Sequence, residues 1–164
     1  MNKTAIIIPS RLDAQRLPNK PLKLINNKEM ILHVHDLAVK SNVGKVYVAT
    51  PDQKIIDVIK NNGEQAIRTS LDHQTGTDRI YEVFKTHLNN EPNIIVNLQG
   101  DMPNIDPQAI KDLISYMSKD QCDIGTLASS FSSKSEFLDK NNVKVTVKEK
   151  LFLDNFVKAT DFSR

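Results

Sequence analysis

Three short stretches of this sequence gather residue types that can hold phosphate or metal. The first, residues 10–20, carries three cations, Arg11, Arg16 and Lys20, within ten residues. Arginine can bind a phosphate group through two N–H groups at once, and lysine adds a compact positive charge. Two interpretations stay open for this stretch: a phosphate-binding loop or a basic loop exposed to solvent. It is not a P-loop, because the glycine-rich spacing that ends in Gly-Lys-Ser/Thr is absent.

The second stretch, residues 72–79, reads Asp-His-Gln-Thr-Gly-Thr-Asp-Arg and lies just ahead of an expected helix. The N-terminal N–H groups of such a helix point at whatever binds there, and Gly76 would let a ligand approach the backbone closely. The alternative is an ordinary helix start, in which Asp72 and Thr77 satisfy backbone donors. Taken by itself the stretch favours that alternative, and His73 alone decides nothing. His33, His35 and His87 fall in expected helices and are interpreted as structural.

The third stretch, Gln99-Gly100-Asp101, directly follows the apolar run over residues 94–98. A carboxylate presented at the end of a strand can hold Mg²⁺, which prefers oxygen ligands, keeps several waters and bridges to substrate phosphates. The alternative is that Asp101 stabilises its own turn beside Gly100. The residues alone do not decide between these two roles.

Alternating strands and helices must position these stretches. The apolar run Thr4–Ile8, stopped by Pro9, predicts a strand buried on both faces in the middle of a sheet. Further strands are expected over residues 46–50, 65–69 and 93–98. Helices are expected over residues 30–40, over 53–61 behind an Asp52 cap, from Thr77 or Asp78 to 88, and from Asp106-Pro107 to 117.

Regular alternation of this kind predicts an α/β fold with a mostly parallel sheet flanked by helices. In open sheets of that type, ligands bind beyond the carboxyl ends of the strands. All three stretches should therefore meet at one edge of the sheet. Residues 9–29 read as a long loop across that edge. The C-terminal part predicts strands near 124–130, 143–147 and 157–162, with a short helix between them.

The bulk composition fits one cytoplasmic domain. The chain has 164 residues, of which 39% are hydrophobic, enough to bury one core without disulfides. Lysine and arginine exceed aspartate and glutamate by only two, 22 against 20, so no nucleic acid or membrane partner is expected. Cys122 stands alone and is interpreted as a buried structural thiol. No apolar run is long enough for a signal peptide or a membrane span.

Several strings together resemble the 3-deoxy-manno-octulosonate cytidylyltransferases, also called CMP-Kdo synthetases. They are IIIPSRLDAQRLPNKPL, VATPD, DHQTGTDRI, IIVNLQGDMP and NNVKV, and they extend over residues 6–145. The resemblance implies a Rossmann-like fold of the nucleotide-diphospho-sugar-transferase type. It also implies a Mg²⁺-dependent reaction in which CTP and Kdo give CMP-Kdo and pyrophosphate, a step that supplies lipopolysaccharide synthesis.

The same resemblance implies roles for individual residues. Lys20, Arg11 and Asp101 would be catalytic, with Asp101 as the Mg²⁺ ligand and Gln99 as the contact to the sugar acid. The nucleotide would be bound by a larger set of residues from the first two stretches: Ser10, Arg11, Arg16, Lys20, Asp72, His73, Thr75, Gly76, Thr77 and Arg79. Catalysis would consist mainly of positioning and charge neutralisation.

The chain departs from the family pattern at two points. Met102 stands where the family usually has an acidic residue after the metal-binding aspartate. The sequence also ends at Phe162-Ser163-Arg164, which resembles a segment that precedes the family's sugar-acid and dimerisation part. We therefore expect residues 1–164 to form one nucleotide-binding domain that lacks this part and with it much of the family's homodimer interface. Two alternatives follow: an inactive nucleotide-binding remnant, or a cytidylyltransferase for another sugar acid.

Overall fold

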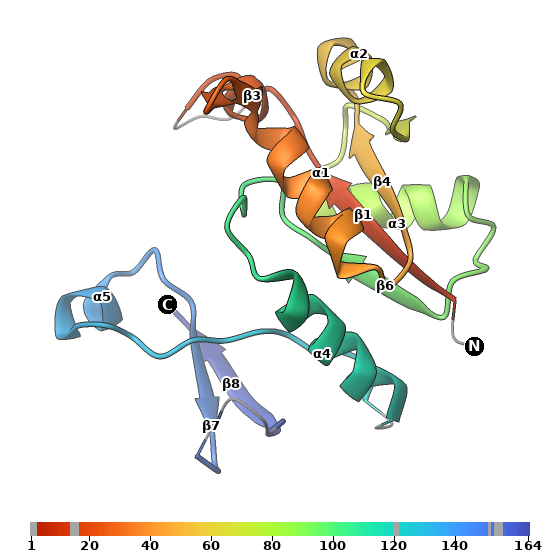
Figure 1. Ribbon diagram of the computed structural model, residues 1–164. Coiled ribbons are helices and arrows are strands. Elements are labelled where there is room, and N and C mark those ends of the chain that lie inside the picture. Colours follow the sequence, from red (N-terminus) through yellow and green to blue (C-terminus); the bar gives the residue numbers. More distant parts are fainter. Residues whose placement is uncertain (1–2, 14–16, 120–121, 151, 153–155) are drawn as a thin grey trace.

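Four parallel strands form the central sheet, in the order β5-β4-β1-β6 (Figure 1). The computed structural model describes residues 3–13, 17–119, 122–150, 152 and 156–164. The strands are β1 (Thr4–Pro9), β4 (Lys45–Thr50), β5 (Ala66–Arg68) and β6 (Ile94–Asn97). The predicted parallel sheet is therefore confirmed, with β1 in its interior.

Strand β1 is buried on both faces because helices cover both sides of the sheet. Its pairing is parallel on each side, with Ile6 opposite Val46 of β4 and Val96 of β6. Successive side chains of a strand point to opposite faces. Accordingly Ile6 and Ile8 belong to one core cluster, whereas Ile7 belongs to the other.

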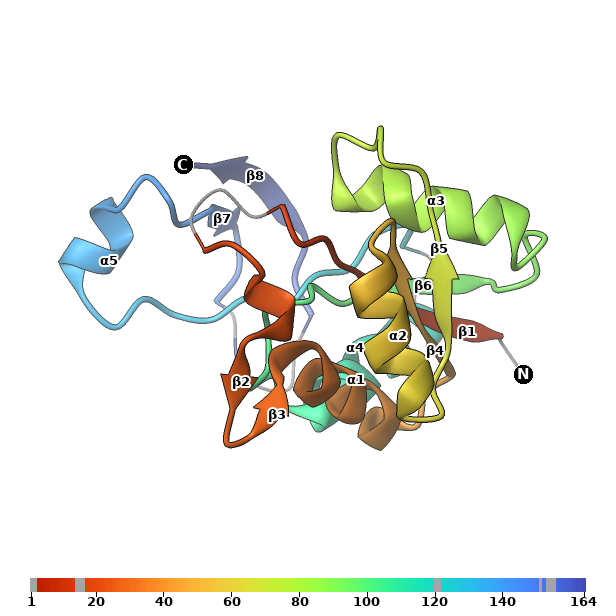
Figure 2. The same cartoon turned by 90° about the horizontal axis from the view of Figure 1, so that it is seen from above.

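The four long helices divide between the two faces (Figure 2). Helices α1 (Met30–Ser41), α2 (Gln53–Asn61) and α4 (Pro107–Lys119) contribute to the core on the side of Ile6 and Ile8. Helix α3 (Gly76–Thr86) packs on the opposite side through Ile80 and Val83. All four helices occur where the sequence predicts them, with ends that differ by at most two residues. The Asp106 carboxylate accepts a hydrogen bond from the Gln108 N–H at 2.8 Å, as expected for the start of α4.

The predicted loop over residues 9–29 contains structure of its own. A short 3-10 helix, η1 (Lys20–Leu22), precedes a small hairpin of β2 (Leu24–Ile25) and β3 (Lys28–Glu29). The two turn residues between these strands, Asn26 and Asn27, have φ values of 49° and 63°. Asparagine tolerates this left-handed conformation, and two consecutive residues in it make the turn that best suits a tight hairpin. The chain therefore returns compactly to the start of α1.

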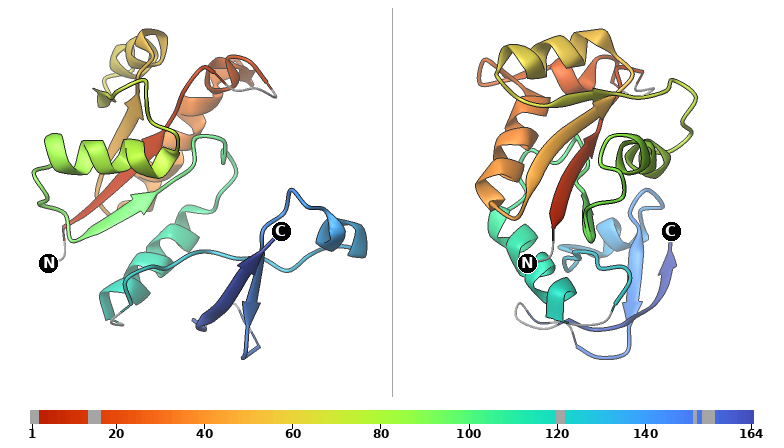
Figure 3. Two further views of the ribbon diagram at one scale, coloured as in Figure 1. Left: turned by 180° about the vertical axis from the view of Figure 1, so that it is seen from behind. Right: turned by 90° about the vertical axis from the view of Figure 1, so that its right-hand side faces the viewer.

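The C-terminal part lies apart from the central sheet (Figure 3, left). It contains α5 (Lys134–Leu138) and the antiparallel strands β7 (Lys144–Val147) and β8 (Ala159–Ser163). The strand predicted near residues 124–130 is absent there, because that stretch meets no partner strand, and Ile124 is 88% exposed. Cys122 is also exposed, so the prediction of a buried thiol was wrong.

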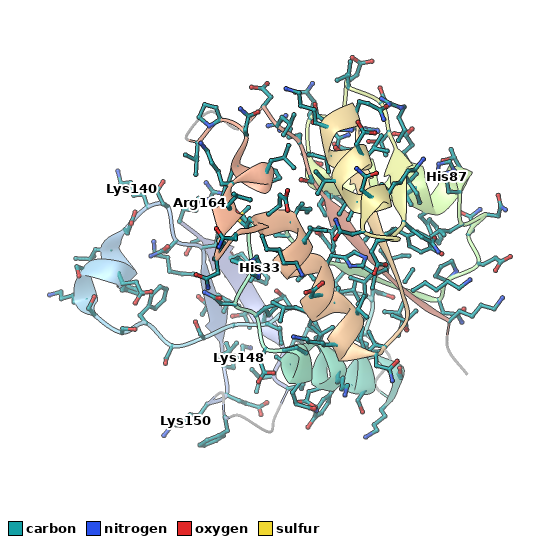
Figure 4. All side chains as sticks on the ribbon, turned by 45° about the horizontal axis from the view of Figure 1, so that its top comes forward. His33, His87, Lys140, Lys148, Lys150 and Arg164 are labelled. Atoms are coloured by element: carbon teal, nitrogen blue, oxygen red, sulfur yellow. The ribbon has the colours of Figure 1, made fainter. Side chains whose placement is uncertain are left out.

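The histidines differ in their surroundings. His35 is buried in α1, and the His33 Nε2 lies 2.8 Å from the Ile25 carbonyl oxygen, so both are structural as predicted. His87 lies exposed at the end of α3, so its expected packing role was wrong (Figure 4). In the described ranges we find no helix that is both long and apolar enough to cross a membrane.

We expect the buried His35 to make stability depend on pH. Burial lowers the pKa of His35, against the opposing effect of the Glu64 carboxylate 3.5 Å from its Nε2. The unfolded chain then takes up the proton more readily, so the free energy of unfolding should fall as pH drops below about 6.5. Urea unfolding at about pH 7.5 and about pH 5 should show this fall, and His35→Gln should reduce it. An equal fall in the variant would contradict the assignment.

Candidate functional site

A pocket of ≈ 260 Å³ opens at the carboxyl edge of the central sheet. It is lined by residues from the end of β1, from η1, from the start of α1, from the β5–α3 connection and α3, and from the turn after β6. They are Pro9, Ser10, Arg11, Lys20, Pro21, Met30, His73, Gln74, Thr75, Gly76, Arg79, Gln99, Gly100 and Asp101. The three chemically suggestive stretches of the sequence therefore meet at one place.

The central position of β1 brings these stretches together. The Ser10 N–H donates to the Ala49 carbonyl at 2.9 Å, so pairing with the β4 side continues one residue beyond β1. On the other side, the Leu98 N–H donates to the Ile7 carbonyl at 3.2 Å. Ser10 and Gln99 therefore leave neighbouring strands at the same level.

Two glycines allow the neighbouring connections to approach Pro9 closely. A Cβ atom added to Gly76 would lie 3.1 Å from the Pro9 ring, and one added to Gly100 would lie 3.0 Å from the Pro9 carbonyl oxygen. Both contacts are tighter than ordinary van der Waals packing. The missing side chain at Gly76 therefore allows close packing against Pro9 and also leaves the pocket open. The sequence alone predicts only that Gly76 lets a ligand approach the backbone.

Asp52 anchors the first loop of the pocket. The sequence predicts Asp52 as the cap of α2, but its side chain makes no capping hydrogen bond there. Its Oδ2 instead accepts from the Leu12 N–H at 2.8 Å, next to Arg11. The contact joins residues forty positions apart, so local spacing could not reveal it.

Ser10 offers an unused polar group beside the pocket. The residue is 7% exposed, and its Oγ has no hydrogen-bond partner among the described residues. A buried hydroxyl without a partner is costly, and a bound polar ligand would satisfy it. Ser10 therefore supports a site for a polar molecule in the pocket.

Two arginines give the pocket a positive field. Arg79 is only 3% exposed, and its Nη1 donates to Thr69 Oγ1 and, at 3.0 Å, to the Ser70 carbonyl. Burial, and next the charge of Arg11, lower the pKa of Arg79, whereas Asp52 and Glu82 act in the opposite direction. An arginine keeps its charge in a protein at neutral pH. These two cations would therefore be stabilised by an anion in the pocket.

The third cation, Lys20, is already paired. Its Nζ lies 2.7 Å from the Oδ2 of Asp101, across the pocket rim, and both side chains are partly exposed. The predicted phosphate-binding lysine and the predicted metal-binding carboxylate therefore neutralise each other in the ligand-free protein. An incoming anion would compete with Asp101 for Lys20, and an incoming cation would compete with Lys20 for Asp101.

Helix α3 begins one or two residues earlier than expected. Thr75 is its N-cap: the Thr75 Oγ1 accepts from the Asp78 N–H, and the Asp78 carboxylate accepts from the Thr75 N–H, each at 3.1 Å. The prediction that Asp72 and Thr77 satisfy the backbone donors of this helix was therefore wrong. The cap directs the first turn of α3, with Thr75 and Gly76, toward the pocket.

Most predicted site residues line the pocket, and a few do not. Asp72 lies outside the lining and shapes its own turn, in which its N–H donates to Ser70 Oγ at 3.2 Å. Thr77 is exposed on the first turn of α3 and also lies outside the lining. Arg16 falls outside the described residues. Sequence reasoning missed Gln74, Pro21 and Met30, which carry no charge and lie in predicted loop or helix.

The described residues fit a magnesium ion only in part. No group of three or more histidine, cysteine, aspartate or glutamate side chains in the described ranges could hold a metal by itself. Among the described residues that line the pocket, only Asp101 presents a carboxylate. Mg²⁺ is commonly bound by one or two carboxylates together with water and substrate phosphates. Asp101 therefore suits a metal that arrives with a phosphate ligand better than a permanent metal site.

Comparison with known proteins agrees with this geometry. A family model described as cytidylyltransferase matches residues 5–164. The chain is similar to the 3-deoxy-manno-octulosonate cytidylyltransferase of Brucella ovis, with 40% identity over 144 residues, which make up 87% of this chain and 57% of the relative. The chain thus spans little more than half the length of that curated relative.

Solved structures give the same picture. A CMP:2-keto-3-deoxy-manno-octonic acid synthetase complexed with CTP matches with a TM-score of 0.81 and 34% identity, over 98% of this chain and 64% of that one. A cytidylyltransferase from Leptospira borgpetersenii matches with a TM-score of 0.61 and 26% identity, over 74% of this chain and 51% of the other. The observed fold is therefore shared by nucleotide-transferring proteins.

The Lys20–Asp101 pair predicts opposite effects of two substitutions on anion binding. In the absence of metal, Lys20→Ala should weaken binding of tripolyphosphate by about three- to tenfold, because one charged donor is lost. Asp101→Asn should strengthen it by a few-fold, because Lys20 is released and a like charge is removed. Isothermal titration calorimetry measures both changes.

Lys23→Ala is the matched control, since Lys23 lies three residues away, is exposed and does not line the pocket. The affinity of the Lys23→Ala variant for tripolyphosphate should stay close to that of the unaltered chain. Weaker metal-free binding by the Asp101→Asn variant would show that the pair does not limit access to Lys20.

Proposed function

Because the chain belongs to the cytidylyltransferase family, we propose that it binds CTP and transfers CMP to 3-deoxy-manno-octulosonate, with release of pyrophosphate. The name of the Brucella ovis relative supports this acceptor, and the CTP complex of the similar synthetase supports the donor. The product would serve lipopolysaccharide synthesis. We place this reaction in the cytoplasm.

The observation that carries the proposal is the convergence of unlike polar groups on one pocket. Arg11 and Arg79 supply positive charge, Ser10 supplies a hydroxyl without a partner, and the first turn of α3 supplies backbone N–H groups. A triphosphate needs several cations and N–H donors at once. The adjoining Asp101 carboxylate adds the ligand type that a phosphate-bound cation requires.

The proposed reaction needs no covalent enzyme intermediate. A hydroxyl oxygen of the sugar acid forms a bond to the α-phosphorus of CTP, and the bond from that phosphorus to the β-phosphate oxygen breaks. The hydroxyl proton passes to solvent, and pyrophosphate leaves with the bonding electrons. Arg11, Lys20 and Arg79 would orient the triphosphate and neutralise the charge that develops on the leaving group.

Two residues are assigned to the remaining components. Gln99 lines the pocket and donates through its side-chain amide to Asn97 at 2.7 Å, and we assign it to the sugar acid. Asp101 would hold Mg²⁺ together with the phosphates. When bound, the ion would supply positive charge to the transferring phosphate and to the pyrophosphate.

A chain that binds CTP without turnover is a second candidate. Met102 favours it, because this exposed apolar side chain follows Asp101 where the resemblance expects an acidic residue. One negative charge is then missing beside the proposed metal ligand. The other alternative is transfer of CMP to a different sugar acid, and it would involve the same nucleotide-binding residues of the pocket.

A pyrophosphate-release assay with CTP, 3-deoxy-manno-octulosonate and Mg²⁺ tests the proposal. We expect release by the unaltered chain and a loss of about 10² to 10³-fold in Asp101→Ala, the usual effect of removing one group that stabilises transition-state charge. Lys23→Ala, outside the pocket, should retain the full rate.

Three other results would change or refute the proposed function. CTP binding in calorimetry without pyrophosphate release selects the second candidate. Release that depends on another acid in a panel of sugar acids changes the acceptor only. A chain that binds no CTP at all refutes the proposal.

A further inference from the structure

The connection between β5 and α3 supplies several pocket residues but is exposed along most of its length. It carries His73, Gln74 and Thr75 to the pocket, whereas Leu71 and Asp72 beside them are exposed. Apolar packing therefore contributes little to holding this segment in place. Its position must come from polar contacts.

Two side chains of α3 hold the backbone of one residue in this connection. The Ser70 N–H donates to the Glu82 Oε2 at 3.0 Å, and the Ser70 carbonyl accepts from the Arg79 Nη1 at 3.0 Å. Arg79 and Glu82 are three residues apart on α3, so they lie on the same face of that helix. One anion and one cation thus fix both polar groups of the same residue.

Glu82 also holds the ring of His73. The His73 Nε2 contacts the same Oε2 oxygen of Glu82 that accepts from Ser70. Burial alone would raise the pKa of Glu82, but the hydrogen bonds from His73 and Ser70 and the charges of His73 and Arg79 together lower it. Glu82 is therefore a carboxylate at neutral pH, and the Nε2 that faces it must carry a hydrogen.

This arrangement fixes which ring nitrogen of His73 stays available. With Nε2–H directed at Glu82, the Nδ1 atom is left without a hydrogen bond to any residue that the structure describes. His73 itself lines the pocket, whereas Glu82 does not. A carboxylate behind a histidine sets the orientation and tautomer of its ring, as it does for histidines that bind metals.

We propose that Glu82 is a positioning residue of the pocket, which fixes the His73 ring and the Ser70 peptide in the arrangement that receives CTP. This inference rests on the proposed function. Glu82 acts on the nucleotide only through the two groups that it holds. Its substitution should therefore weaken CTP binding more than it slows the chemical step.

The kinetic test compares Glu82→Gln and Glu82→Asp with the unaltered chain. We expect Glu82→Gln to raise KM for CTP about tenfold, with kcat changed less than about threefold, because ground-state positioning is lost. Glu82→Asp keeps the charge and should lie between the two. Glu91→Gln is the matched control, since Glu91 is an exposed carboxylate just beyond α3 that pairs with Lys3 and does not line the pocket. It should leave both constants unchanged.

A double-mutant cycle then separates positioning from general stability. If Glu82 acts largely through His73, Glu82→Gln should cost little more affinity for CTP once His73→Ala is present. An unchanged KM in a folded Glu82→Gln chain would overturn the proposal, and fully additive losses would overturn the part of it that assigns Glu82 to the His73 ring. Circular dichroism and thermal unfolding establish that each variant is folded.

Nitrogen NMR of the His73 ring tests the inference without any nucleotide. The unaltered chain should show a protonated, hydrogen-bonded Nε2, and Glu82→Gln should shift that signal and speed exchange of the Ser70 amide. If the His73 ring and Ser70 amide signals are the same in Glu82→Gln as in the unaltered chain, the proposed role of Glu82 is refuted. Failure of the unaltered chain to bind CTP, with the NMR changes present, refutes only the proposed function.

Discussion

Parallel pairing of β1 with both of its neighbours is the constraint on which the pocket depends. Because the three strands run in the same direction, Ser10 and Gln99 leave the sheet at the same edge. The connection into α3 reaches that edge as well, and Gly76 and Gly100 let the flanking segments close against Pro9. With β6 antiparallel to β1, Asp101 would lie at the opposite end of the sheet from Arg11 and Lys20. The charges of the pocket are thus assembled before any ligand arrives, which lowers the cost of binding.

Much of the fold could be predicted because burial leaves a clear pattern in the sequence. Residues 5–8 are all apolar because both faces of β1 are covered, and each long helix shows its own period. The hairpin of β2 and β3 escaped detection, since strands of two residues are too short to show a period. Asn26-Asn27 was the available signal. The strand expected near residues 124–130 failed for a different reason, because a strand needs a partner that local sequence cannot supply.

The candidate site could likewise be predicted from the sequence only in part. Positions that follow directly from strand ends, such as Arg11 and Asp101, could be predicted to face one edge. The N-cap at Thr75 was missed, although the spacing of Thr75 and Asp78 is typical of a capping box. Asp52 and Glu82 had no comparable signal. Their partners, Leu12 and the 70–73 segment, are brought to them by tertiary structure, so only the folded chain reveals carboxylates that orient the pocket from outside it.

Because the C-terminal part lies apart from the sheet, we infer that the two parts of the chain open at different free-energy costs. None of its described residues beyond 122 is buried, and its ties to α4 include the stacked rings of Tyr116 and Phe156, with centroids 3.8 Å apart. Segments with so little buried surface open locally at small free-energy cost, while buried strands open only with the whole domain. Amide protons of β7 and β8 should therefore exchange with solvent long before those of β1. The C-terminal part can then rearrange or change in sequence without disturbing the charged edge where the nucleotide would bind.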